Sequence, residues 1–168
     1  SSDVCSSDLS ESAQIVVLER DQHVSFANCG MPYHIGGDIR DRSALLVQTP
    51  ESLAENLALD VRVGNEVVAI DPSAHTVTVR DINTDTTYSQ AYDKLVLATG
   101  ASPLKPAIPG VDSPLVHTLR NLADMDRIKT VVDSRAGRAV VVGGGYIGVE
   151  MVEALRHRQW DVTLLEAA

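Results

Sequence analysis

The residue in this chain best suited to nucleophilic or redox chemistry is Cys29, in the segment SFANCGMPYHIGG at residues 25–37. A thiol attacks as its thiolate, a form that a polar and partly exposed setting favours. Ser25 and Asn28 supply polar neighbours, and Gly30 would let the backbone approach a flat ligand without a Cβ in the way. A lone cysteine is more often a small buried hydrophobe in a turn. Taken alone, Cys29 is therefore only a candidate nucleophile.

A second candidate site is the glycine-rich segment GGGYIG, whose spacing over residues 143–148 is G-x-G-x-x-G. It follows the apolar run AVVV and opens an amphipathic segment, and a further apolar run ends in an acid about 20 residues later, as in dinucleotide-binding βαβ units. Gly143 permits the tight turn, Gly145 lets a pyrophosphate meet the backbone, and Gly148 allows close helix–strand packing. A glycine-rich turn without a ligand is the weaker interpretation of this context.

The residues after this turn predict which nucleotide binds. The helix starting near Gly145 would present amide groups and its positive dipole end to the phosphates, with Tyr146 and Ile147 in its first turn. Glu166 would accept hydrogen bonds from the adenosine ribose, and its carboxylate would repel a 2′-phosphate. The sequence therefore predicts NADH as the preferred nucleotide, with NADPH left open.

A further acid stands at Glu19, where the apolar run AQIVVL of residues 13–18 ends. A continuous apolar strand closing on a carboxylate is typical of the second strand of a dinucleotide fold, in which the acid binds a ribose hydroxyl. An ordinary buried strand with a solvated glutamate at its end fits this stretch equally well.

The elements that position these residues indicate an α/β chain with a small β insertion. Thr49 and Pro50 are suited to the N-cap and first position of a helix through about Leu57. Short β-rich runs separated by turn residues predict a small antiparallel meander. These runs cover residues 61–63, 66–70, 76–80 and 86–89.

The C-terminal half predicts alternating strands and helices. Residues 92–98 predict a buried strand that runs into a tight turn at Thr99 and Gly100. The apolar spacing of residues 118–134 predicts an amphipathic helix. A βαβ unit follows, with its strands at residues 138–142 and 161–165 and its helix at 145–158.

Composition excludes several classes of function. The net charge of −9 and pI near 4.9 leave no basic stripe for nucleic acid, and no apolar run is long enough to span a bilayer. The two cysteines cannot form a disulfide framework, which indicates a reducing cytoplasm. The five histidines have no zinc-like spacing, so no metal site is predicted. His34 is interpreted as a solvent-contacting loop residue, and Trp160 as packing.

The two ends of the sequence differ from its middle. The first nine residues, SSDVCSSDL, form a polar tail that resembles the translation of a sequencing adapter, and the chain stops directly after a strand. We therefore expect a non-native tail at residues 1–9, followed by two dinucleotide-binding-type domains, the first at 10–112 and the second beginning at 113 and running to 168. The proline-rich stretch at 103–110 marks their boundary.

Together, the motifs SFANCGMPYHIGG, LVLATGASP and VVVGGGYIGVE resemble those of the single-cysteine branch of the FAD-dependent pyridine nucleotide-disulfide oxidoreductases. This branch includes coenzyme A-disulfide reductases, NADH oxidases and NADH peroxidases, and the resemblance runs from Ser10 to the C-terminus. Asn28-Cys29 and Pro32-Tyr33 bring the chain closer to the reductases. The resemblance implies FAD/NAD(P)-binding Rossmann-like domains, incomplete at both ends and interrupted by the small antiparallel meander. Residues 10–112 would be a partial FAD-binding domain, and residues 113–168 the start of the NAD(P)H-binding domain.

The resemblance also implies roles for individual residues. Cys29 would be the redox nucleophile, with Ser25 and Asn28 near the coenzyme A thiol. The implied FAD contacts are Glu19, Arg20, Val67, Thr99 and Gly100. The implied nicotinamide-nucleotide contacts are Gly143, Gly145, Tyr146, Ile147, Gly148, Glu150 and Glu166.

Three functions remain open at this point. The first passes electrons from NADH through FAD to Cys29 and on to coenzyme A disulfide or a related disulfide or polysulfide. The second uses oxygen or peroxide as acceptor and a sulfenic acid at Cys29. The third is a nicotinamide-binding module that senses redox state without turnover. The family's first βα unit, which holds the flavin pyrophosphate, is absent, so we expect the isolated chain to bind flavin poorly. A homodimer is expected of the full-length protein.

Overall fold

The computed structural model describes residues 12–167. The adapter-like tail and Cys5 lie outside the described residues. The chain divides into two compact units, one built from residues up to 26 and from 46–98, the other from residues 27–45 and from 99 onward. The second unit includes the Cys29 segment because helix α1 packs on helices near the C-terminus. The predicted domain division differs from this grouping and stays a prediction.

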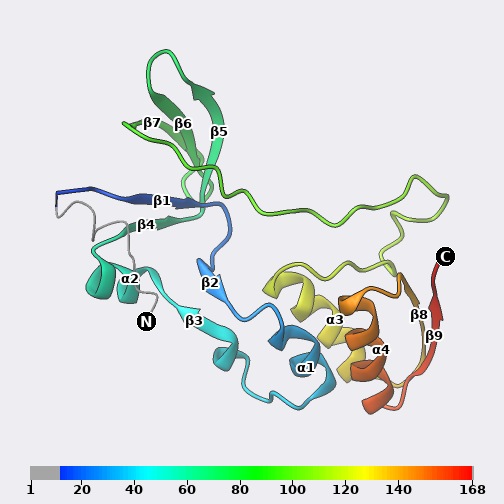
Figure 1. The fold of residues 1–168 in the computed structure, drawn as a ribbon. Helices are drawn as coiled ribbons and strands as arrows, with labels where there is room; N and C mark the ends of the chain where they lie inside the picture. Colours follow the sequence, from blue (N-terminus) through cyan, green and yellow to red (C-terminus); the bar gives the residue numbers. More distant parts are fainter. Residues whose placement is uncertain (1–11, 168) are drawn as a thin grey trace. The chain divides into compact units, whose positions relative to one another are not determined.

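The first unit contains a parallel pair of strands, β1 (Val16–Glu19) and β4 (Asp60–Val63), with Glu19 opposite Val63. Helix α2 (Pro50–Leu57) precedes β4 (Figure 1). Thr49 caps it as predicted, since its hydroxyl accepts from the Ser52 amide and the Ser52 hydroxyl accepts from the Thr49 amide. A short antiparallel pair joins β2 (Ser25–Phe26) to β3 (Leu46–Gln48), and the sequence did not predict it.

The meander is a three-stranded antiparallel sheet in the order β5-β6-β7. Its strands are β5 (Asn65–Asp71), β6 (Thr76–Asp81) and β7 (Thr86–Ala91). Val77 and Val79 on β6 are its buried residues. Arg62 donates to the Tyr88 hydroxyl and to Gln90, so β4 is tied to β7.

The second unit contains the predicted βαβ unit (Figure 1). Strands β8 (Arg138–Val142) and β9 (Asp161–Leu165) pair in parallel, and helix α4 (Tyr146–His157) connects them. Helices α1 (Gly30–Gly36) and α3 (Leu122–Ser134) complete the unit, and α1 packs against both α3 and α4. A short 3₁₀ helix, η2 (Arg42–Leu45), follows α1.

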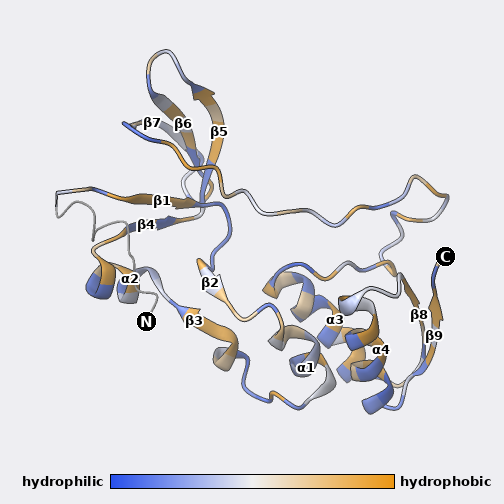
Figure 2. Cartoon of the chain, in the orientation of Figure 1, coloured by the Kyte–Doolittle hydropathy of each residue, from blue (hydrophilic) through white to orange (hydrophobic). Residues whose placement is uncertain are grey.

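The core of this unit consists of apolar residues from facing helices. Figure 2 shows helices α3 and α4 with mixed apolar and polar surfaces, and the buried positions account for their apolar part. The buried apolar residues of α1, α3 and α4 are Met31, Ile35, Leu122, Met125, Val132, Met151, Ala154 and Leu155.

Three expectations about the elements are wrong. Residues 61–63 lie in the parallel pair with β1 rather than in the meander. Residues 92–98 form no strand, and the side chains of Val96 and Leu97 are exposed. A strand requires a hydrogen-bonded neighbour, and no described strand pairs with this segment. Helix α3 begins at Leu122 rather than Thr118, because the Asn121 side chain accepts from the Asp124 amide and caps it there.

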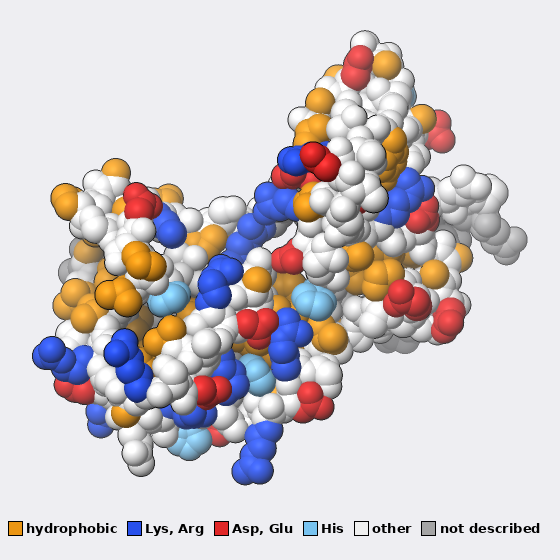
Figure 3. Space-filling model, turned by 180° about the vertical axis from the view of Figure 1, so that it is seen from behind, with side chains coloured by type: hydrophobic (Ala, Val, Ile, Leu, Met, Phe, Trp, Pro, Cys, Tyr) orange, Lys and Arg blue, Asp and Glu red, His pale blue; other side chains and the backbone are white. Residues whose placement is uncertain are grey.

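No described helix is long and apolar enough to cross a membrane. Acidic and basic side chains both occur across the face drawn in Figure 3.

Candidate functional site

Cys29 is exposed and unpaired among the described residues, and it directly precedes helix α1. Two backbone hydrogen bonds form the turn into the helix, from Gly30 N to Ala27 O at 3.0 Å and from Met31 N to Asn28 O at 3.2 Å. The Cys29 side chain makes no capping hydrogen bond. A thiol in this position is accessible to a reagent or a disulfide. Asn28 beside it is also exposed.

Gly30 has a different role from the one the sequence indicated. A Cβ built on Gly30 would overlap Cδ2 of Leu45 and would lie 3.4 Å from Cδ1 of Ile39. This side of the glycine therefore faces the protein interior and not a ligand. Leu45 is fully buried, and its carbonyl accepts a 2.8 Å hydrogen bond from the Ala27 amide.

The interpretation of His34 as a solvent-contacting loop residue is wrong. His34 lies within α1 and is only 5% exposed. Its Nδ1 donates to the Ile39 carbonyl at 2.7 Å, which assigns the proton to Nδ1. The sequence misses this because burial here depends on α1 being a helix. Its two glycines and a proline gave no helical signal.

The glycine-rich turn has the geometry that its motif predicts. Gly143 has φ +104°, a conformation that favours glycine. A Cβ on Gly148 would overlap the Gly143 carbonyl oxygen and lie 3.6 Å from Val141, so helix α4 and strand β8 approach as closely as the motif requires. At Gly145, by contrast, a Cβ would have no atom within 4 Å.

This arrangement fits a dinucleotide phosphate. The first backbone hydrogen bond of α4 runs from Val149 N to Gly145 O at 3.0 Å. The preceding amides of residues 146–148 have no partner within the helix, and helix N-termini of this kind bind phosphates. Tyr146 is 94% exposed beside the open space at Gly145, so its ring is free of packing on this unit.

Glu166 lies at the same turn. Its Oε2 accepts a hydrogen bond from the Gly144 amide, which joins the end of β9 to the glycine loop. The exposed carboxylate therefore lies against the glycine loop at Gly144, and its binding of a ribose stays a prediction.

The predicted FAD-binding residues divide between the two units. Glu19, at the end of β1, accepts a 2.7 Å hydrogen bond from the Asp21 amide. Arg20 lies 3.7 Å from Glu66, in an ion pair beside Val67 on β5. Thr99 and Gly100 belong to the other unit. Gly100 has φ +65°, as expected for the predicted tight turn.

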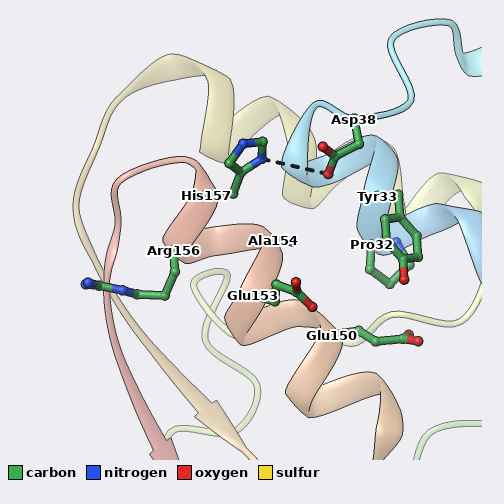
Figure 4. Close-up of a pocket in the computed structure, with 8 residues that line it drawn as sticks. All are labelled: Pro32, Tyr33, Asp38, Glu150, Glu153, Ala154, Arg156 and His157. Atoms are coloured by element: carbon green, nitrogen blue, oxygen red, sulfur yellow. Dashed lines mark ion pairs between the residues drawn. The ribbon is translucent and has the colours of Figure 1, made fainter.

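A cavity of about 410 Å³ lies between α1 with its following loop and α4 (Figure 4). Glu150 lines it and also borders a second hollow at the glycine loop. His157 Nδ1 lies 3.7 Å from Asp38 Oδ2 across the cavity. Sequence reasoning named Glu150 but missed the cavity, because its walls come from segments more than a hundred residues apart. The lining residues are Pro32, Tyr33, Asp38, Glu150, Glu153, Ala154, Arg156 and His157.

The described residues contain no group of three or more His, Cys, Asp or Glu side chains that could hold a metal ion. The site thus consists of an exposed thiol at the start of α1 and a dinucleotide-type turn at the start of α4. The pyridine nucleotide-disulphide oxidoreductase family model matches residues 5–168. The chain belongs to this family.

Individual relatives agree with this membership. The chain is 40% identical over 156 residues to a coenzyme A disulfide reductase of Staphylococcus epidermidis, covering 92% of this chain and 35% of that protein. It superposes on reduced CoADR-RHD of Bacillus anthracis with a TM-score of 0.91 and 48% identity, over 96% of this chain and 29% of that one. A water-forming NADH oxidase of Lactobacillus brevis bound to NADH gives a TM-score of 0.86 and 35% identity, over 95% and 35% of the two chains.

Family membership confirms the predicted α/β fold of FAD/NAD(P)-binding type and the cofactor classes, FAD and NAD(P)H. The chain spans about a third of the length of the curated relatives it matches. The roles of single residues at the site stay predictions.

Proposed function

We propose that the protein containing this chain is a flavin-dependent NADH oxidoreductase that reduces coenzyme A disulfide through Cys29. The observation that carries the proposal is the exposed, unpaired Cys29 thiol at the start of α1. It stands in the context Asn28-Cys29 with Pro32-Tyr33 following, which resembles the reductases more than the oxidases. The relatives named coenzyme A disulfide reductase support the same assignment.

In the proposed reaction the Cys29 thiolate attacks one sulfur of the substrate disulfide. The substrate S–S bond breaks, one coenzyme A thiolate leaves and takes a proton, and the other half stays on Cys29 as a mixed disulfide. Two electrons and a proton then release the second coenzyme A and regenerate the Cys29 thiolate. NADH and FAD, when bound, supply those two electrons. One cysteine suffices because the substrate provides the second sulfur.

Residues of this chain would hold the cofactors and the substrate. The amides of residues 146–148 and the open space at Gly145 fit a pyrophosphate, and Glu166 would accept from the adenosine ribose. For FAD the chain would contribute Glu19, Arg20, Val67, Thr99 and Gly100. Ser25 and Asn28 would contact coenzyme A, and Tyr146 and Glu150 would lie near the nicotinamide.

The acceptor is tested on the whole protein by following NADH oxidation with coenzyme A disulfide, glutathione disulfide, hydrogen peroxide or oxygen. We expect turnover with coenzyme A disulfide to exceed turnover with the other acceptors, and Cys29→Ser to abolish it. Equal or faster turnover with oxygen or peroxide would move the assignment to an oxidase or peroxidase. A protein without flavin that binds NADH equally well after Cys29→Ser would instead be a nicotinamide-binding sensor.

The nucleotide preference is tested separately with Glu166→Gln. Glutamine keeps an oxygen that can accept from the Gly144 amide but removes the charge that repels a 2′-phosphate. We expect the ratio of NADPH to NADH turnover to rise in this variant. Glu153→Gln removes a charge from an exposed position on α4, away from the glycine loop, and should leave the ratio unchanged. An unchanged ratio in Glu166→Gln would exclude Glu166 as the selecting residue.

We also propose a homodimer and a cytoplasmic location for the full-length protein. The dimer follows from the family resemblance, and the location from the low cysteine content. Sedimentation velocity of the whole protein tests the first, since a monomer at micromolar concentration would contradict it.

A further inference from the structure

We propose that Leu45 is a positioning residue for the Cys29 thiol, because its buried side chain fixes the turn that carries the cysteine. The proposal rests on the proposed function, in which Cys29 is the reacting group. Leu45 lies at the end of η2, sixteen positions after Cys29 in the sequence, and its aliphatic side chain can act only by packing.

Leu45 contacts both sides of the cysteine turn. Its carbonyl accepts the Ala27 amide at 2.8 Å, two residues before the cysteine. Its Cδ2 occupies the space where a Cβ of Gly30 would lie, directly after the cysteine. The Cys29 backbone is thus held between two contacts with one residue.

Leu45 itself is held in place. It is fully buried, and Ile39 packs on the same glycine. At the other end of η2, Arg42 forms a two-pronged hydrogen bond with Asp126 of α3, with Nε to Oδ1 and Nη2 to Oδ2 both 2.9 Å. This carboxylate also raises the pKa of the Arg42 guanidinium. A side chain packed and anchored in this way acts as a rigid support.

The turn at Cys29 affects the placement of the reacting sulfur. The Cys29 side chain makes no capping hydrogen bond, and the backbone turn fixes the position of the Cβ from which the sulfur projects. Thiol–disulfide exchange and electron transfer to the sulfur both depend on its placement, and a shift of about 1 Å at a reacting group costs about 100-fold in rate. A glycine at position 30 therefore leaves room for the Leu45 side chain, which a Cβ at this position would displace.

The test uses a compensating pair of substitutions in the whole protein. Gly30→Ala places a methyl group into Leu45 and displaces the turn, so kcat for coenzyme A disulfide should fall about tenfold or more while the Kd for NADH stays unchanged. In Gly30→Ala/Leu45→Ala the new methyl group finds room, and kcat should return toward the wild-type value.

A matched control separates positioning from stability. Gly36→Ala lies at the other end of α1, where the new Cβ would stand 3.3 Å from Ala154 Cα. It strains the packing of α1 on α4 without touching the cysteine turn. We expect its melting temperature to fall while kcat stays near wild type.

A second readout keeps the test independent of the assigned substrate. The rate of Cys29 alkylation by iodoacetamide at a fixed pH, measured on the Cys29 peptide by mass spectrometry, should change in Gly30→Ala and return in the double variant. If coenzyme A disulfide is not reduced but this pattern holds, the proposed function fails and the positioning role stands.

Two results would overturn the role of Leu45. One is a Gly30→Ala variant with wild-type kcat and wild-type alkylation. The other is a folded double variant that restores neither. If the double variant fails to fold, Leu45→Ile decides: it keeps the side-chain volume but moves the branch toward the backbone, and should alter kcat without altering the Kd for NADH. Unchanged kcat would contradict the proposal.

Discussion

Replacing Gly145 by alanine should weaken nucleotide binding without weakening the fold. Gly145 has φ −68° and ψ 175°, a conformation that alanine adopts readily, and its Cβ would have no atom within 4 Å. A glycine-to-alanine change in a compatible conformation stabilises a protein by about 0.4–1 kcal/mol through the unfolded chain. Gly145 is also the N-cap of α4, a position where alanine is less favourable than glycine. The two effects offset each other, so the melting temperature should change little.

The loss of NADH affinity can be estimated from the same geometry. The new methyl group would occupy the open space through which the pyrophosphate reaches the amides of residues 146–148. A hydrogen bond to a charged group contributes about 1.5–3 kcal/mol. Losing one of them raises the Kd for NADH by about 10- to 100-fold, since 1.4 kcal/mol corresponds to a factor of ten.

Gly148→Ala provides the contrast. Its Cβ would overlap the Gly143 carbonyl oxygen, a backbone atom that no rotamer change can move away. Overpacking of this kind costs about 1–3 kcal/mol, so this variant should lose both stability and NADH affinity. Calorimetric titration with NADH and thermal unfolding of both variants measure the two effects. A Gly145→Ala variant with wild-type NADH affinity would refute the binding of pyrophosphate at this turn.

Three further predictions concern the framework around the site. Trp160→Phe should keep or raise the melting temperature, because the indole Nε1 is buried without a hydrogen-bond partner among the described residues, whereas Trp160→Ala should cost about 3–5 kcal/mol in chemical denaturation. Thr49→Ala should destabilise α2 by about 1 kcal/mol, seen as a lower denaturation midpoint, because it removes the capping box with Ser52. Hydrogen bonding from Lys129 holds the pKa of Asp133 below its ordinary value of 3.8, so Asp133 contributes stability that is fully present above that value and is lost as the pH falls through its lowered folded-state pKa. Asp133→Asn should therefore lower the melting temperature at about pH 7, and this loss should shrink steadily as the pH is lowered below 3.8.

The parts predicted correctly from sequence are those with local signals. The βαβ unit follows from its apolar runs and the glycine spacing, and the structure places its strands at the predicted residues. Helix α2 likewise has its cap and first-position proline within the sequence. In both cases neighbouring residues determine the conformation.

The structural features that the sequence did not predict depend on contacts between residues far apart in the chain. The parallel pairing of β1 with β4 joins segments more than 40 residues apart, and alternation within residues 60–63 cannot distinguish it from a meander strand. The burial of His34 and the contact of Gly30 with Leu45 exist only once α1, η2 and α4 have packed. Cys29 could be selected as the reactive residue from its sequence context, but the support beneath it could not.

Mass analysis of Cys29 shows most directly whether this thiol forms a mixed disulfide with coenzyme A. The whole protein would be reduced with NADH, desalted, incubated with coenzyme A disulfide, digested without reductant and analysed for the Cys29 peptide. We expect one coenzyme A in disulfide linkage on Cys29, released when NADH is added again before digestion. Turnover of coenzyme A disulfide with Cys29 unmodified throughout, or undiminished in Cys29→Ser, would contradict it.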